Sequence, residues 1–235
     1  MSELPVILIT GTSRGLGKYL VEHFCRHGYR VIGCSRSGES IVSHPQYSHC
    51  RVDISKEQDV RELFQKIREE YRRLDIVINN AAINTALSLA LMTPFQSAVE
   101  TMAVNFLGTF IISRESAKLM MRRKFGRIIN ISSMAVRHEV AGESIYTSSK
   151  AAVHALTRVL AKELYPNGIT CNVVAPAAVP TPMMETVDKV ALKEVLRRNA
   201  IPEVGELKDV VQTIEWLIRP ESCAITGQVI YLGGV

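Results

Sequence analysis

The stretch Thr10-Gly11-Thr12-Ser13-Arg14-Gly15-Leu16-Gly17 decides the fold, because it joins a short apolar run directly to a helical pattern. The run before it, Leu4–Thr10, is rich in β-branched residues, and Arg14–His27 after it has helical periodicity. Glycines at such a junction allow a sharp turn and a close approach of the backbone to a pyrophosphate. The N–H groups at the start of the helix attract the same anion. The stretch therefore predicts a phosphate-binding strand–loop–helix unit.

Strand-like and helix-like segments alternate along the rest of the chain. The further predicted strands are Arg30–Ser35, Tyr47–Ile54, Asp75–Asn79, Arg127–Ile131, Ile169–Val174 and Gln228–Leu232. The further predicted helices are Lys56–Arg73, Ser97–Arg123, Tyr146–Leu164 and Leu207–Ile218. This alternation predicts one α/β domain over residues 1–235, a doubly wound parallel sheet of Rossmann type with helices on both faces. The connection Ser37–Gln46 is too short for a full crossover helix, so we expect it to be abbreviated.

Composition narrows the class of protein. The 235 residues are 47% hydrophobic, which is enough for a real core and excludes disorder and a coiled coil. No uninterrupted apolar run reaches the roughly 18 residues of a membrane span, and no signal peptide precedes the first strand. Five cysteines without paired spacing predict neither a metal site nor a disulfide framework, and favour a reducing, cytoplasmic compartment. The net charge of +5 is scattered, which favours a small acidic ligand over nucleic acid.

Four further motifs follow the glycine stretch in order. They are Asn79-Asn80-Ala81-Ala82, Asn105 within Val104-Asn105-Phe106-Leu107-Gly108, Ser133 at the end of Gly126–Ser133, and Tyr146-Thr147-Ser148-Ser149-Lys150. Together the five motifs resemble those of the short-chain dehydrogenase/reductase family over essentially the whole chain, and most closely those of its 3-oxoacyl-[acyl-carrier-protein] reductases. The resemblance implies a catalytic tetrad of Asn105, Ser133, Tyr146 and Lys150.

The Tyr146–Lys150 pair also makes chemical sense without the resemblance. A lysine four residues after a tyrosine lies on the same helix face, and its charge is expected to lower the phenol pKa from about 10 towards working pH. Such a phenol suits general acid/base catalysis. The resemblance adds that Ser133 polarises a substrate carbonyl, that Lys150 reaches the ribose, and that Asn105 holds a water which relays protons.

Charge at the adenosine ribose indicates which cofactor the chain binds. No acid follows the second strand before Glu39, whereas Arg14 and Arg36 stand where a 2′-phosphate would lie. Arginine binds phosphate in a fork geometry, so we expect NADP(H). The complete predicted cofactor site comprises Gly11, Ser13, Arg14, Gly15, Leu16, Gly17, Arg36, Asp53, Ile54, Asn80, Ala81, Tyr146, Lys150, Val179 and Thr181.

The expected activity is NADPH-dependent reduction of a ketone, 3-oxoacyl-like or another small carbonyl, to a secondary alcohol. Two alternatives remain open: a dehydrogenase that oxidises a sugar, polyol or steroid alcohol, and a catalytically idle dinucleotide sensor that regulates a partner. The segment Thr181–Val204 is expected to fold over the substrate as an adaptable, methionine-containing lid. Family resemblance implies a homodimer or homotetramer built on the two long helices, and neither a nucleic-acid nor a membrane partner is expected.

Two alanines depart from the family pattern. Ala82 replaces the usual glycine after Asn-Asn-Ala and adds a methyl group near the cofactor. Ala177 replaces the glycine after Pro176, so that loop must avoid positive φ.

Several residues outside the motifs are predicted to have structural roles only. We expect His23 and His27 to be isolated, His138 to lie in a surface loop, and Trp216 to pack in the core. Small buried hydrophobes are expected at Cys25, Cys34, Cys171 and Cys223.

Overall fold

The computed structural model describes residues 4–38, 42–84, 87–186 and 189–234. Its strands are β1 (Val6–Thr10), β2 (Arg30–Ser35), β3 (Tyr47–Arg51), β4 (Ile76–Asn79), β5 (Gly126–Ile131), β6 (Ile169–Ala175) and β7 (Val229–Tyr231). They form one sheet in the order β3-β2-β1-β4-β5-β6-β7, and every adjacent pair is parallel. The predicted doubly wound α/β fold is confirmed.

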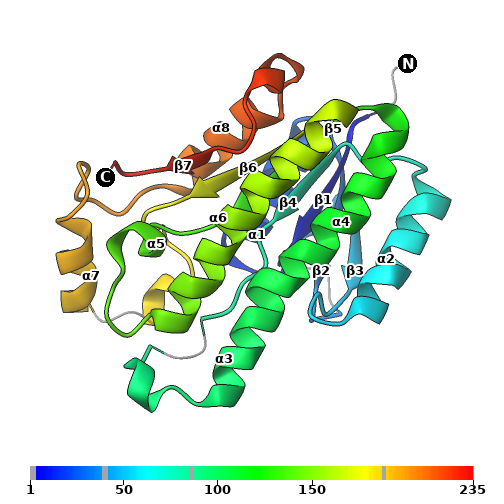
Figure 1. The fold of residues 1–235 in the computed structure, drawn as a ribbon. Helices are drawn as coiled ribbons and strands as arrows, with labels where there is room; N and C mark the ends of the chain where they lie inside the picture. The colour runs from blue at the N-terminus through cyan, green and yellow to red at the C-terminus, as the bar shows by residue number, and fades with distance from the viewer. Residues whose placement is uncertain (1–3, 39–41, 85–86, 187–188, 235) are drawn as a thin grey trace.

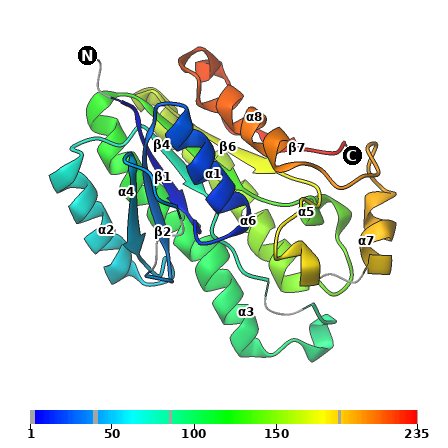
Figure 2. The ribbon, with the colours of Figure 1, turned by 180° about the vertical axis from the view of Figure 1, so that it is seen from behind.

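Helices cover both faces of this sheet. They are α1 (Gly15–Arg26), α2 (Glu57–Glu70), α3 (Phe95–Met102), α4 (Thr109–Met120), α5 (Ala135–His138), α6 (Ser144–Leu164), α7 (Lys189–Leu196) and α8 (Leu207–Ile218). Helices α2, α4 and α6 lie in front of the sheet in Figure 1, and α1 and α8 cover the face seen in Figure 2. The strand pattern explains this division, since alternate residues point to opposite faces. Val6 and Leu8 of β1 join the core under α2, α4 and α6, and Ile7 and Ile9 join the core under α1 and α8.

The chain reverses its winding direction between β1 and β4. It passes outward from β1 through β2 to β3, then returns to β4 and continues to β7 on the other side. Loops at the carboxyl ends of β1 and β4 therefore diverge, which is where ligands bind in sheets of this kind. Gly11 turns the chain here with φ +73°, and a Cβ on Gly17 would lie only 2.1 Å from the Gly11 carbonyl oxygen. Both positions therefore require glycine.

The helix predicted over Ser97–Arg123 begins earlier and is not uniform. It begins at Phe95, and residues Ala103–Gly108 adopt π-helical geometry between α3 and α4. By length and composition, the helical run Phe95–Arg123 is apolar enough to cross a membrane, but α4 packs on β4 and β5 of the sheet. Only 28% of the residues in the most apolar 18-residue stretch of Phe95–Arg123 are buried. Much of this apolar surface is therefore left exposed.

The expectations for the Ser37–Gln46 connection, the third strand, Trp216 and Cys223 were met only in part. Of the connection Ser37–Gln46, the described residues 37–38 and 42–46 contain no helix, as expected, and 39–41 lie outside the described residues. The third strand ends at Arg51 rather than Ile54. Trp216 was wrongly assigned to the core: its side chain is 45% exposed, because α8 turns Ile214 and Leu217 towards the sheet instead. Cys223 was also misplaced, since it is exposed.

Candidate active site

A cleft of about 850 Å³ opens at the carboxyl ends of the strands, at the switch point between β1 and β4. Every predicted site residue except Asn105 lines it. Those residues are Gly11, Ser13, Arg14, Gly15, Leu16, Gly17, Arg36, Asp53, Ile54, Asn80, Ala81, Ser133, Tyr146, Lys150, Val179 and Thr181. The fold thus gathers segments from most of the chain into one site, large enough for an extended ligand.

The glycine loop is held in place by residues of the neighbouring strand end. Asn80 Nδ2 donates to the carbonyl oxygens of Thr10 at 2.9 Å and Gly11 at 3.1 Å. The backbone N–H groups of Asn80 and Ala81 donate in return to Thr10 Oγ1. Asn80 thus fixes the loop rather than pointing a free amide into the cleft. The first turn of α1 contains no acidic residue, so its N–H groups can face an anion.

Two arginines lie at the outer end of the cleft. Arg14 and Arg36 are both exposed, and within the described residues neither has a carboxylate within ion-pair distance. Burial raises the pKa of nearby Asp53, but hydrogen bonds from Ser55 and the charge of Arg36 outweigh it, so the pKa lies below its usual value. This end of the cleft therefore carries positive charge able to bind phosphate.

A polar network that the sequence did not indicate supports the turn carrying Arg36. Tyr47 Oη donates to Thr12 Oγ1 at 3.1 Å and contacts His49 Nδ1 at 3.0 Å. On its other side, His49 Nε2 contacts Ser35 Oγ at 3.2 Å and the Ser37 carbonyl at 3.1 Å. Residues two apart on a strand point to the same face, so β3 places Tyr47 and His49 together. This spacing was the only feature of the sequence from which the network could have been predicted.

Tyr146, Ser133 and Lys150 meet at the inner end of the cleft. Burial raises the pKa of Tyr146 to about 12, a hydrogen bond with the Ser133 side chain opposes this, and the charge of Glu143 adds to it. The prediction that Lys150 holds this pKa near working pH is wrong for this structure. Lys150 Nζ lies 5.9 Å from the centre of the Tyr146 ring and donates to the Ile131 carbonyl at 2.8 Å. At neutral pH the phenol is therefore protonated, the form that can give a proton.

Lys150 is itself almost fully enclosed. Burial lowers the pKa of its ammonium group to about 8. The lysine therefore carries its charge at neutral pH and begins to lose it in mildly alkaline solution.

Asn105 lies behind the cleft and connects its parts. Its Oδ1 accepts from the Ile83 N–H at 2.9 Å, and its Nδ2 donates to the Ile83 carbonyl at 2.9 Å and to Ser149 Oγ at 3.0 Å. Ser149 Oγ in turn donates to the Tyr146 carbonyl at 2.7 Å. Asn105 sits in the π-helical segment, and such bulges are frequent at functional sites. It therefore ties the loop after β4 to the first turns of α6.

A buried serine–histidine pair lies next to Ser133 in the chain. Ser132 Oγ lies 2.7 Å from His154 Nε2. Burial, followed by the charges of Arg158 and Lys150, lowers the pKa of His154 to about 4, so the ring is neutral. This pair was not predicted from the sequence, although His154 follows Lys150 by four residues and so shares its helix face.

Another part of the cleft lining combines apolar side chains with one carboxyl group. Glu143 is half-buried, and Asn84 Nδ2 donates to its Oε1 at 3.3 Å. Burial raises the pKa of Glu143, partly offset by this hydrogen bond. Around it the cleft is lined by Leu87, Val140, Met183, Met184, Leu192 and Val195. Four of these belong to the predicted lid Thr181–Val204, of which residues 187 and 188 lie outside the described residues.

The C-terminal strand braces the lid and the loop at Ala177. Ala177 N–H donates to the Leu232 carbonyl at 3.1 Å, and the Ile201 N–H donates to the Gly233 carbonyl at 2.8 Å. Ala177 avoids positive φ, as expected. His138 is not in a loop but ends α5, where its Nε2 lies 2.7 Å from Asn199 Oδ1.

Comparison with known proteins identifies the class. Residues 5–191 match the family model described as short chain dehydrogenase. The chain belongs to the short-chain dehydrogenase/reductase family and is an oxidoreductase of that family with a nicotinamide dinucleotide cofactor.

Individual relatives are similar over nearly their full length. The 3-oxoacyl-[acyl-carrier-protein] reductase FabG of Thermotoga maritima is 32% identical over 241 residues, covering 99% of this chain and 97% of the relative. The solved structure described as ElxO with NADP bound is 28% identical with a TM-score of 0.89, covering 97% of each chain. A 3-ketoacyl-(acyl-carrier-protein) reductase from Brucella melitensis complexed with NADH shares the fold at 24% identity and a TM-score of 0.91, covering 98% of this chain and 97% of that chain.

Proposed function

We propose that this protein is an NADP(H)-dependent reductase that converts a ketone to a secondary alcohol. The observation that carries the proposal is a single cleft with two exposed arginines at its outer end and a protonated, buried tyrosine at its inner end. The arginines suit a 2′-phosphate, and the neutral phenol suits proton donation to a carbonyl oxygen.

The cofactor site fits a nicotinamide dinucleotide. Gly11 has φ +73° and lies so close to Ala81 that a Cβ would come within 2.7 Å of its Cα, which keeps the loop tight, and the first residues of α1 line the cleft beside it. A pyrophosphate would lie against residues Gly11–Gly17, the 2′-phosphate between Arg14 and Arg36, the adenine beside Asp53 and Ile54, and the inner portion against Ala81, Val179 and Thr181. When bound, NADPH supplies a hydride to the substrate carbonyl carbon.

The chain's own residues handle the proton. Ser133 Oγ and Tyr146 Oη would both hydrogen-bond the carbonyl oxygen, which orients the ketone and polarises it. Tyr146 would then give its proton to that oxygen as negative charge develops there. Lys150 would bind the ribose hydroxyls, and Asn105 would position the loop and helix around them.

The proposed substrate is a 3-oxoacyl thioester or a similar small ketone. Apolar side chains of the proposed lid, such as Met183, Met184 and Leu192, suit an acyl chain. The FabG relative is named as a 3-oxoacyl-[acyl-carrier-protein] reductase. We also propose that residues 1–235 form one domain and that the protein works in the cytoplasm, in keeping with its five free cysteines.

A panel of ketones assayed by loss of NADPH absorbance tests the proposal. We expect a 3-oxoacyl thioester, or another small ketone on the panel, to oxidise NADPH faster than NADH. Secondary alcohols of the sugar, polyol and steroid classes are assayed with NADP⁺ alongside. Turnover of those alcohols with no reduction of any ketone would replace the reductase by a dehydrogenase, and no turnover at all would favour a dinucleotide sensor.

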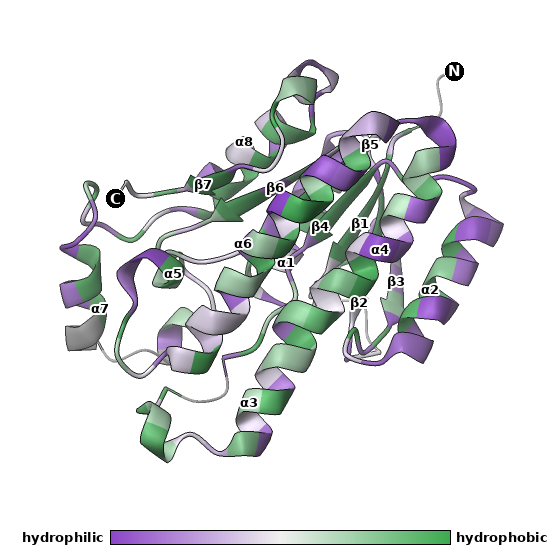
Figure 3. Cartoon of the chain, viewed as in Figure 1, coloured by the Kyte–Doolittle hydropathy of each residue, from purple (hydrophilic) through white to green (hydrophobic). Residues whose placement is uncertain are grey.

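We further propose that copies of the chain assemble through the α3–α4 face. Hydrophobic residues are frequent along α3 and the turn before it, as the green colour in Figure 3 shows, and several of their side chains are exposed. They are Leu89, Leu91, Met92, Phe95, Val99, Leu107 and Phe110, with Leu91 at 96% and Phe95 at 83%. An exposed patch of this kind marks an interaction surface, and helices α3 and α4 lie within the segment expected to build the oligomer.

Light scattering is expected to show a dimer or tetramer at micromolar concentration. Changing Phe95→Glu should shift the protein towards smaller species, because a charge would be buried in the interface. The matched control is Gln65→Glu, which adds the same charge on exposed α2. A wild-type monomer, or equal dissociation by both variants, would contradict this assembly.

A further inference from the structure

Two histidines of α1 and one glutamate of α8 gather at the end of α1 remote from the cleft. His23 and His27 are four residues apart, on one face of the helix, and Glu215 reaches them from the neighbouring helix. One ligand atom from each lies within 4.8 Å of the other two. We propose that these three residues bind a divalent transition-metal ion of the Zn²⁺ class, joining α1 to α8.

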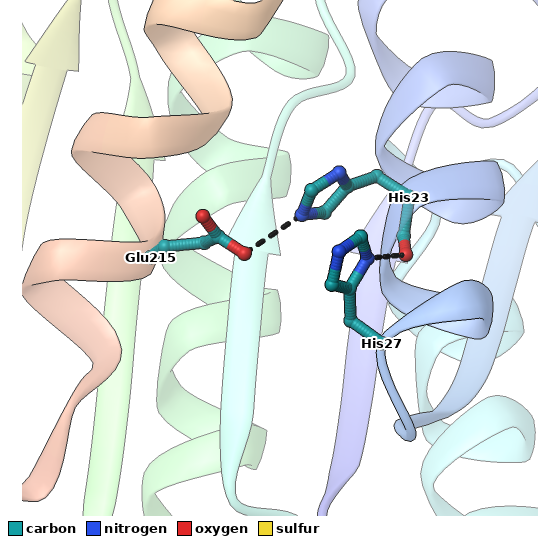
Figure 4. Close-up of side chains that lie close together, drawn as sticks. All are labelled: His23, His27 and Glu215. Carbon is teal, nitrogen blue, oxygen red and sulfur yellow. Dashed lines mark hydrogen bonds and ion pairs between the residues drawn. The ribbon is translucent and has the colours of Figure 1, made fainter.

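The hydrogen bond of His27 leaves one of its ring nitrogens ready for a metal. His27 Nδ1 lies 2.7 Å from the His23 carbonyl oxygen. A carbonyl can only accept, so the proton of the neutral ring is on Nδ1 and Nε2 carries the lone pair. Figure 4 shows that this second nitrogen faces the side on which the Glu215 carboxylate lies. A backbone carbonyl holding the outer nitrogen is the usual support of a metal-binding histidine.

His23 lies one helical turn before His27 and provides the second imidazole. Its Nε2 lies 2.8 Å from Glu215 Oε1, and its ring stacks on that of His27 with centres 4.0 Å apart. A metal ion would replace the hydrogen atom now shared between His23 and Glu215. Two imidazoles and a carboxylate form a ligand set that suits Zn²⁺ and its neighbours, with water in the fourth position.

The packing of the two helices presents these ligands in fixed positions. Phe24, next to His23, is fully buried and meets the His23 ring edge-on at 5.3 Å. Ile214, next to Glu215, is fully buried in the same hydrophobic core. The His23 and Glu215 side chains remain 20% and 31% exposed and His27 is exposed, so an ion can enter from solvent.

None of the three residues lines the cleft. The expected role of the metal is therefore a clamp between α1, whose first turn faces the cofactor, and α8. An ion that binds only the folded chain raises its stability.

Titration of tag-free, metal-stripped, full-length protein with Zn²⁺ tests the site. Calorimetry is expected to show one ion per chain, and the melting temperature should rise with Zn²⁺ concentration. His27→Gln should weaken binding at least tenfold and reduce the thermal shift at the same Zn²⁺ concentration. Because His27 is exposed, this variant is expected to fold normally. Glu215→Gln should also weaken binding.

Two control variants test whether another histidine or a cysteine binds the added Zn²⁺. His44→Gln removes a histidine elsewhere on the surface, and Cys223→Ser removes an exposed thiol; both should bind Zn²⁺ as the wild type does. Co²⁺ in place of Zn²⁺ should give ligand-field bands without a thiolate charge-transfer band. Binding that survives His27→Gln, or that is lost with Cys223→Ser, would overturn the proposal.

Discussion

Replacing Tyr146 by phenylalanine is expected to reduce turnover by about 10²–10⁴-fold, while NADPH should still bind. General acid catalysis contributes an effect of this size, and Tyr146 is the proposed proton donor. The ring remains, so the buried packing around it is kept. Single-turnover NADPH oxidation with a working ketone measures the chemical step, and quenching of NADPH fluorescence measures binding.

The matched control is Tyr165→Phe, on an exposed tyrosine just past the end of α6. It should leave both quantities unchanged. Near-normal turnover in Tyr146→Phe would remove the tyrosine from the mechanism and, with it, the assignment of Ser133 and Lys150 as its partners.

Removing either Arg14 or Arg36 is expected to weaken NADPH binding by about ten- to a hundredfold. A hydrogen bond to a charged group contributes roughly 1.5–3 kcal/mol, and each arginine is assigned such bonds to the 2′-phosphate. NADH lacks that phosphate, so its affinity should change little. The double variant Arg14→Ala/Arg36→Asp should narrow or invert the preference between the two cofactors.

Fluorescence titration with both cofactors measures this without any substrate. Added salt should weaken NADPH binding more than NADH binding, because both arginines are exposed. Arg26→Ala, at the opposite end of α1, is the control and should change neither affinity. Equal affinity of the wild type for both cofactors would contradict the NADP(H) assignment.

Local patterns were enough to predict the sheet, the glycine loop and most of the cleft. The strand and helix periods are properties of neighbouring residues, and the seven strands and the longer helices followed them except at their ends and in the π-helical segment Ala103–Gly108. The short helices α5 and α7 were not predicted. The glycine loop was predictable because its constraint is also local: Gly17 must approach Gly11 closely. Motifs in a fixed order then placed Ser133, Tyr146 and Lys150 together, since parallel strands end at one edge of the sheet.

The spacing of apolar residues along a helix could not show which of them pack in the core and which lie at a subunit interface. Val153, Leu156 and Leu160 on α6 suited either role in sequence. In the structure Val153 and Leu160 are buried and Leu156 packs against the same core, whereas Val159 is 51% exposed. The direction in which a helix turns its apolar stripe depends on what it packs against, and that partner is distant in the chain.

The fold and the cofactor loop could be predicted from the sequence alone, because periodicity and motif order act over short stretches, whereas the catalytic tetrad stays a prediction. The packing of distant elements sets the burial that raises the pKa of Tyr146 and Glu143, the pairing of His154 with Ser132, and the meeting of His23 with Glu215, 192 residues away. The physical reason is the same in each case. The pKa of a group and its contacts depend on burial and on neighbours from other elements, and only packing brings those together.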